Sequence, residues 1–306
     1  MKRRSFIKRS AGAGLAAGAA LALGSRAGLL ASVPQSKPYD MVAVMGGSPE
    51  AMFDIGIQSL GGIGSYVRKG QKVVIKPNIG WDVTPERAGN THPGLVKRII
   101  EHCLRAGASD VYLFDNTCDD WVKCYKSSGI EKAAKDAGAK VVPGNSESYY
   151  QSVTIPDGKI LKSAKVHELI LECDVFINVP VLKHHSSAKM TATMKNMMGV
   201  VWDRRFWHVN NLHQCIADYT MYERKPSLHV VDCYNVMLKN GPRGVSVADL
   251  VEMKSMILTS DWVAADTAAA RMMGLNPEQI DYIPMAQKLG AGTMNLESLN
   301  IHRIKM

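Results

Sequence analysis

The sequence has 306 residues, of which 46% are hydrophobic and 21% are charged, so the chain is long enough to bury a substantial core. Its formal net charge is +9, but six basic residues lie within the first 26 positions and no acidic residue precedes Asp40. Without those six the chain carries only +3. Nucleic-acid-binding proteins usually carry a much larger positive charge, so we expect no nucleic-acid partner.

Residues 1–33 have the composition of a signal peptide. A charged opening, MKRRSFIKRS, is followed by a short apolar run without acids and then by small residues. The run is too short and too rich in glycine to predict a membrane span. Arg3 and Arg4, followed by Ser-Phe-Ile-Lys, resemble the twin-arginine export motif, and an ordinary basic signal peptide is the alternative. We therefore expect export to the periplasm or another extracytoplasmic compartment, with a membrane link only if the signal stays uncleaved.

Residues 38–306 alternate apolar β-branched runs with helical patterns, which predicts one α/β domain with a mainly parallel sheet and helices on both faces. The predicted strands are 41–44, 72–75, 110–114, 139–142, 174–179, 227–231 and 254–258. The predicted helices are 51–66, 93–106, 129–137, 167–171, 210–222, 261–273 and 277–289. Residues 146–162 predict a small β-hairpin inserted into this alternation.

The six cysteines contain no CxxC pair, so the sequence encodes no iron–sulfur cluster motif and no zinc ribbon. In an oxidising compartment Cys118 and Cys124 could form a disulfide. Cys103, Cys173 and Cys233 lie in apolar segments, and we expect them in the core.

Polar residues follow five of the predicted strands at the point where each strand ends. Ligands in open α/β sheets bind beyond the carboxyl ends of the strands, so parallel strands would gather these residues along one edge. The five sets are Lys76 with Pro77 and Asn78, Asp115 with Asn116 and Thr117, Lys183 with His184 and His185, Asp232, and Ser260 with Asp261.

Lys183 and His184 carry the sharpest chemical signal of these sets. A lysine can bind an anion or act as a base if its pKa is depressed, and a histidine can bind metal or move protons near neutral pH. A solvated basic loop is the alternative. Lys195 and Asn196 would extend the cationic pocket, whereas Thr193 fits a ligand contact and a capping residue equally well.

Three further features have competing interpretations. The turn KNGPRG offers Arg243 as an anion ligand or as part of a plain surface turn. Segment 202–215, with two Trp, two Arg and two His, predicts an aromatic lid or a surface helix with a buried Trp. The methionines at 190, 194, 197 and 198 favour packing over a soft metal site.

Four segments resemble the DUF362 family, a group of α/β proteins named for their unknown function. They are VVIKPNIG (73–80), DVFINVPVLKHHSSAKMTATMKNMMG (174–199), VVDCYNVMLKNGPRG (230–244) and LTSDWVAADTAAARMMG (258–274). The family pattern is met by Lys183, His185, Thr193, Lys195, Asn196 and Gly199. The resemblance thus favours His185 over His184. Many relatives carry a ferredoxin-like cysteine cluster, which this sequence lacks. The resemblance therefore does not identify the cofactor, which could be a metal. A partner protein could supply electrons.

Together these observations predict an exported enzyme or redox accessory protein that binds a small anionic substrate or cofactor. The predicted catalytic residues are His185, Lys183 and Asp115. The predicted ligand-binding residues are Lys76, Asn78, Asn116, Thr193, Lys195, Asn196, Arg243 and Asp261. The alternative is a non-catalytic binding or scaffold protein for an exported redox complex, which the lack of a nucleophilic triad, zinc motif or nucleotide loop favours modestly.

Overall fold

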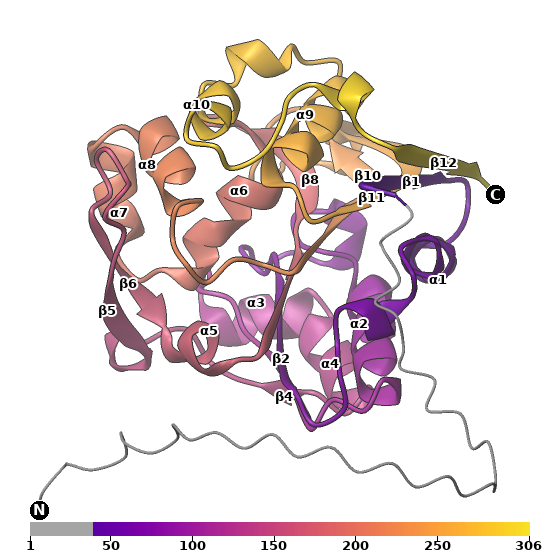
Figure 1. Ribbon diagram of the computed structural model, residues 1–306. Helices are drawn as coiled ribbons and strands as arrows, with labels where there is room; N and C mark the ends of the chain where they lie inside the picture. Colours follow the sequence, from indigo (N-terminus) through magenta and orange to yellow (C-terminus); the bar gives the residue numbers. More distant parts are fainter. Residues whose placement is uncertain (1–38) are drawn as a thin grey trace, which may run out of the picture. The chain divides into compact units, whose positions relative to one another are not determined.

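The computed structural model describes residues 39–306 (Figure 1). The predicted signal peptide lies outside the described residues. Within residues 39–306 no helix combines the length and the apolar character that crossing a membrane requires.

A ten-stranded sheet forms the centre of the described chain, in the order β12-β1-β11-β10-β7-β2-β3-β4, with β8 pairing β10 and β9. Its strands are β1 (Met41–Met45), β2 (Lys72–Pro77), β3 (Asp110–Leu113), β4 (Lys140–Val141), β7 (Val175–Val179), β8 (Val181–His185), β9 (Lys189–Thr191), β10 (Leu228–Met237), β11 (Leu250–Thr259) and β12 (Ile301–Lys305). Along the main order every neighbouring pair is parallel except those of β11, which runs antiparallel to β1 and to β10. The predicted mainly parallel α/β sheet is therefore confirmed.

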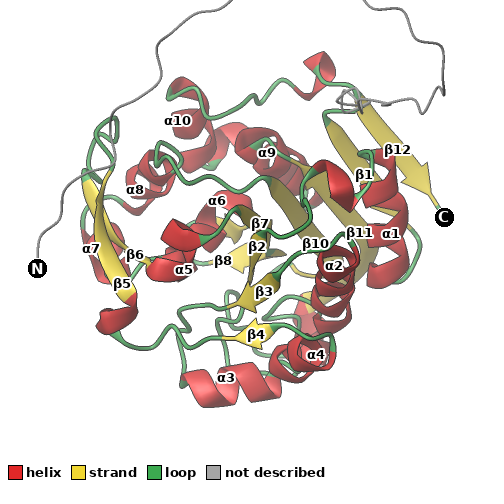
Figure 2. Cartoon of the chain, turned by 60° about the horizontal axis from the view of Figure 1, so that its bottom comes forward, coloured by secondary structure: helices red, strands yellow, loops and turns green. Residues whose placement is uncertain are grey.

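Helices cover both faces of the sheet (Figure 2), as predicted. One face packs against α1 (Pro49–Ser59), α2 (Pro93–Arg105), α3 (Trp121–Ser127) and α4 (Ile130–Asp136). The other packs against α5 (Glu168–Glu172), α6 (Thr193–Asn196), α8 (Leu212–Tyr219), α9 (Trp262–Met272) and α10 (Tyr282–Lys288). Strand β2 shows the alternation that makes this arrangement: Val73 and Ile75 enter one core and Val74 enters the other.

The predicted hairpin is present, with strands β5 (Tyr150–Thr154) and β6 (Ser163–His167) paired antiparallel. Its return strand starts after the end of the predicted segment, because residues 155–162 form the turn. The Trp202 backbone N–H donates to the Lys165 carbonyl at 3.0 Å, which ties the hairpin to the segment before α7 (Arg204–Val209).

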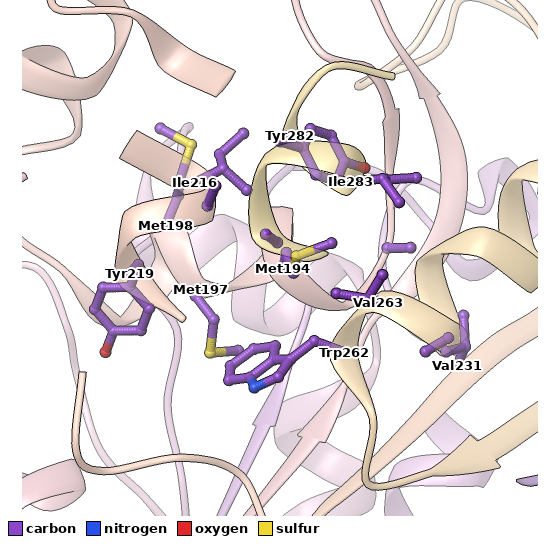
Figure 3. Packing of buried hydrophobic residues seen from close by; sticks show 14 of the residues in the cluster. Met194, Met197, Met198, Ile216, Tyr219, Val231, Trp262, Val263, Tyr282 and Ile283 are labelled. Atoms are coloured by element: carbon purple, nitrogen blue, oxygen red, sulfur yellow. The ribbon is translucent and has the colours of Figure 1, made fainter. Parts of the chain in front are cut away.

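The methionine cluster belongs to the hydrophobic core. Met194, Met197 and Met198 lie among Ile216, Tyr219, Trp262 and Tyr282 in Figure 3, and all three are buried. This outcome favours the packing interpretation of the cluster. Cys103, Cys173 and Cys233 are buried as expected, whereas Cys118 and Cys124 are free thiols and form no disulfide.

Candidate functional site

Eight of the predicted site residues line one small pocket at the carboxyl edge of the parallel strands. They are Lys76, Asn78, Asp115, Asn116, Lys183, His185, Lys195 and Asn196. Strands β2 and β3 are adjacent and parallel, so the residues that follow them emerge at the same edge of the sheet. Strand β8 and helix α6 close the pocket from the other side.

Strand geometry decides which of the two adjacent histidines faces the pocket. Alternate residues of a strand share a face, so Lys183 and His185 lie on one side of β8 and His184 on the other. Both Lys183 and His185 line the pocket, while His184 Nδ1 accepts a hydrogen bond from the Gly241 N–H at 3.1 Å. The placement agrees with the preference for His185 that the family resemblance implied.

A buried ion pair forms the back of the pocket. Lys76 Nζ lies 2.9 Å from Asp115 Oδ1, and both side chains are at most 3% exposed. Lys76 Nζ also donates to Asn196 Oδ1 at 3.0 Å, and Asp115 Oδ2 accepts from the Ile79 N–H at 2.6 Å. Burial lowers the pKa of Lys76, and the neighbouring Asp115 carboxylate opposes that fall.

Gly199 is the residue that allows this ion pair to close. A Cβ atom at position 199 would lie 1.9 Å from Asp115 Oδ1 and 2.5 Å from Lys76 Nζ. No side chain fits there, which gives a physical reason for the glycine that ends the Lys-x-His pattern in the sequence.

Lys183 is held by two acceptors in the middle of the pocket. Its Nζ donates to Asn78 Oδ1 at 3.0 Å and to the Gly89 carbonyl. Burial lowers the pKa of Lys183 to about 7, and the positive charges of Lys195 and Lys76 act in the same direction. Near neutral pH the Lys183 amine can therefore exist in both protonation states.

Lys195 differs from the other two lysines because no residue of the described chain pairs with it. Its side chain lines the pocket with only 9% of the residue exposed. Among residues 39–306 the Lys195 ammonium has no hydrogen-bond or ion-pair partner. Burial lowers its pKa to about 8, and Arg204 and Lys76 contribute to that fall.

His185 is fixed in one tautomer by its own loop. Its Nδ1 accepts from the N–H groups of Ser187 at 3.1 Å and Ala188 at 3.2 Å, so the ring proton resides on Nε2. Burial and the charges of Lys195 and Lys183 lower the pKa of His185 to about 2. The ring thus stays neutral and offers Nε2–H as a donor, whereas the predicted roles of base and metal ligand need a free lone pair on Nε2.

The charge balance of the pocket is positive. Three lysines and Arg204 line it, and Asp115 is the single carboxylate among the described residues that do so. The Arg204 guanidinium is held in place by donating to the carbonyls of Asn116 at 2.9 Å and Thr117 at 2.7 Å. Such an arrangement suits a small anion.

The pocket opens into a larger cleft of about 1060 Å³. The cleft lies between the β5–β6 hairpin and α7, and both cavities share His185, Lys195 and Arg204. The indoles of Trp81 and Trp202 and the ring of Phe206 give the cleft aromatic walls. Helix α7 has a buried Trp207, as the surface-helix interpretation expected, and it also forms a wall of the cleft; the lid remains a prediction.

Three predicted residues are not brought into the pocket. Asp261 lies at the opposite edge of the sheet because β11 is antiparallel, and its carboxylate caps α9 by accepting from the Val263 and Ala264 N–H groups, both at 2.8 Å. This placement corrects the expectation that all five strand-end sets share one edge.

Thr193 and Arg243 lie beside the pocket and face other partners. The Thr193 hydroxyl and the Thr193 N–H both donate to Asp266 Oδ1, the N–H at 2.7 Å, so the side chain faces α9 rather than the cavity. Arg243 is half exposed and pairs with Asp119 at 3.3 Å, above the ring of Trp81.

Two ionisable residues of the pocket, Cys118 and Arg204, are not among the predicted site residues. Cys118 lies three positions after Asp115, within the same strand-end loop, so a strand-end set one residue longer includes it. Arg204 was noted only as part of the aromatic segment, and its contact with the β3 loop is not visible in local sequence. Within residues 39–306 no three His, Cys, Asp or Glu side chains converge to hold a metal ion.

The fold and the pocket together define an α/β protein with a mainly parallel sheet and a buried, lysine-rich cavity at the carboxyl edge of its strands. More specifically, the chain belongs to the DUF362 family, described as a domain of unknown function, whose family model matches residues 73–271. The resemblance seen in the sequence is confirmed to that extent.

Comparison with individual proteins agrees with this assignment. The chain is 23% identical over 243 residues to a thylakoid-associated protein from Synechocystis sp., covering 76% of this chain and 73% of that protein.

Two solved structures resemble the fold. The lactate racemase apoprotein from Thermoanaerobacterium thermosaccharolyticum has a TM-score of 0.48 and 11% identity, covering 76% of this chain and 56% of that one. A structural-genomics protein from Thermotoga maritima has a TM-score of 0.46 and 11% identity, covering 79% and 60%. This chain therefore spans little more than half the length of both.

Proposed function

We propose that this protein is an enzyme or redox accessory protein that binds a small anionic substrate or cofactor in the pocket between Lys76, Lys183 and Lys195. The observation that carries the proposal is Lys195, a residue only 9% exposed whose ammonium has no partner among the described residues. A buried charge is costly unless an opposite charge or hydrogen bonds compensate it. An anion entering from the cleft would supply the missing partner.

Each neighbouring group has a role in holding such an anion. Lys195 Nζ and His185 Nε2–H donate to its oxygen atoms, and the fixed Arg204 guanidinium adds positive charge at the entrance. The Lys76–Asp115 ion pair is already formed and stiffens the back wall. Because Asp115 is engaged by Lys76 and the Ile79 N–H, it positions the lysine rather than reacting itself.

Lys183 is the group best suited to chemistry. With a pKa of about 7 it can take a proton from a bound anion or return one at neutral pH. A docking surface gains nothing from a buried lysine that titrates near neutrality, whereas active sites commonly contain such groups. This favours an enzyme over the non-catalytic scaffold.

Titration calorimetry with simple anions tests the binding proposal. Phosphate, sulfate, acetate and succinate are titrated into the protein at pH 7, and at least one should bind at a single site. Lys195→Gln should weaken that binding roughly tenfold or more, since a hydrogen bond to a charged group contributes about 1.5–3 kcal/mol. Lys165→Gln, which removes an exposed lysine of the cleft that pairs with Glu147, serves as the matched control. Equal binding by the Lys195 variant and the wild type would reject the proposal, as would a wild type that binds none of the four anions.

We further propose that the protein is exported through the twin-arginine pathway, as Arg3 and Arg4 suggest. Replacing both with lysine should leave the protein in the cytoplasm when cells are fractionated. Wild-type export of the double variant would show that another route is used.

A further inference from the structure

Cys118 is placed differently from the other cysteines of the described chain. It is exposed and lines both the pocket and the cleft, whereas the other five are buried. Its backbone N–H donates to the Gly80 carbonyl at 2.8 Å, which fixes the loop between β3 and α3 at this point. The thiol is therefore both accessible and held in position at the mouth of the cationic pocket.

The surroundings of the sulfur are cationic. Arg204 Nη1 donates to Cys118 Sγ at 3.4 Å, and the same guanidinium is anchored by the Asn116 and Thr117 carbonyls. A negative charge on Cys118 would raise the pKa of Lys183 and of Lys195, so the sulfur lies within electrostatic reach of both amines. A reactive cysteine characteristically combines exposure with such cationic neighbours.

Lys195 provides an independent indication that a ligand sits beside this thiol. It is 9% exposed, unpartnered among residues 39–306, and lines the same two cavities as Cys118. An anion bound to the Lys195 ammonium would therefore occupy the space that Sγ borders.

We propose that Cys118 is a covalent attachment site for small anions that carry an electrophilic carbon, with the charge of the anion held by Lys195 and Arg204. The proposal rests on the anion site proposed above and specifies its ligand class. In the reaction, a bond forms between Sγ and the electrophilic carbon while the bond from that carbon to its leaving group breaks. The leaving group departs with the bonding electron pair, and the thiol proton passes to solvent, so no oxidant or reductant is needed.

A matched pair of alkylating reagents tests the proposal on the full chain. Iodoacetate and iodoacetamide both transfer a substituted methylene group to sulfur and release iodide, but only iodoacetate is an anion. The rate of Cys118 alkylation by each reagent is measured by peptide mass spectrometry, and the ratio of the two rates is compared with that of the urea-unfolded chain. We expect the ratio of iodoacetate to iodoacetamide to be roughly tenfold higher in the folded protein, the lower end of the enhancement that focused fields produce.

Variants separate the role of the pocket from general accessibility. Lys195→Gln should lower the ratio severalfold, leaving only the contribution of Arg204, and Lys165→Gln should leave it unchanged, with circular dichroism confirming that both variants fold. A ratio in the folded wild type equal to that of the unfolded chain would overturn the proposal. So would a ratio in Lys195→Gln as high as that of the wild type.

Sulfate titration of the same samples distinguishes the two proposals. If sulfate binds in a Lys195-dependent way and Cys118 shows no preference for iodoacetate, the anion site stands and the attachment site is rejected. If none of phosphate, sulfate, acetate and succinate binds and the preference is also absent, both proposals fail. Protection of Cys118 from iodoacetate by bound sulfate would support both.

Discussion

Replacing Lys195 with methionine should stabilise the protein while weakening anion binding. Methionine has a length similar to that of lysine and no charge, so it removes the buried ammonium and keeps much of the packing. Because Lys195 has no partner among the described residues, no ion pair or hydrogen bond is lost in exchange. Binding-site residues commonly lower the stability of the ligand-free protein in this way, because they are arranged to interact with a ligand.

The size of the gain follows from the cost of burying the charge. A fall in the pKa of Lys195 from 10.5 to about 8 corresponds to ~3 kcal/mol while the lysine is protonated, at 1.36 kcal/mol per pH unit. With imperfect repacking around the new side chain, Lys195→Met should raise the free energy of unfolding by about 2 kcal/mol at pH 7.

The pH dependence of the gain has a definite sign. Below pH 8 the lysine is protonated in both the folded and the unfolded chain, so the wild type bears the full cost of burial. Between pH 8 and 10.5 the folded protein has released the proton and the unfolded chain has not, so the wild type gains stability as pH rises. The advantage of Lys195→Met should therefore shrink between pH 8 and pH 10.

Urea unfolding followed by circular dichroism, in buffers without multivalent anions, measures this advantage at pH 7 and pH 10. Lys165→Met is the control, because Lys165 is exposed and paired with Glu147 and should change the free energy of unfolding by less than about 0.5 kcal/mol. A Lys195→Met variant less stable than the wild type would refute the reasoning, since it would mean that the ammonium has a partner in solution. A gain equal at both pH values would show that charge burial is not its cause.

Three further predictions follow from the same pocket. Asp115→Asn leaves the buried Lys76 ammonium without its counter-charge. The free energy of unfolding, measured by urea titration, should therefore fall by about 3 kcal/mol, and a loss below about 1 kcal/mol would contradict the pairing. His185→Asn keeps an acceptor near the position of Nδ1 but removes the Nε2–H donor. Sulfate affinity, measured by calorimetry, should therefore fall roughly tenfold. The control His184→Asn lies on the other face of β8 and should leave the affinity unchanged. Sulfate affinity should decline as pH rises, first through 7 because Lys183 loses its charge and then through 8 because Lys195 does. The decline through 8 should be much shallower in Lys195→Gln; an equally steep decline in both would assign the effect elsewhere.

Much of the pocket could be predicted because its residues follow strands that local patterns identify. The apolar runs before Lys76 and Asp115 predict two strands, and adjacent parallel strands necessarily present their ends at one edge. Lys195 and Asn196 were placed nearby through their closeness in sequence to β8 and β9, and α6 does carry them to the pocket.

The failures have tertiary causes that local patterns do not contain. Asp261 was misplaced because the direction of β11 depends on the connection from β10, which is a short segment without a crossover helix and therefore returns antiparallel. Thr193 turns toward Asp266, a partner 73 positions away along the chain. Likewise, local sequence does not show that Lys195 is unpaired among the described residues, because this depends on every side chain that surrounds the ammonium.

Anomalous diffraction from crystals soaked in selenate tests most directly whether this cluster of lysines is an anion site. The account predicts a selenium peak in the pocket, with oxygen atoms within hydrogen-bonding distance of Lys195 Nζ and His185 Nε2. Selenate found only at the molecular surface, with Lys195 paired to a protein carboxylate, would contradict it.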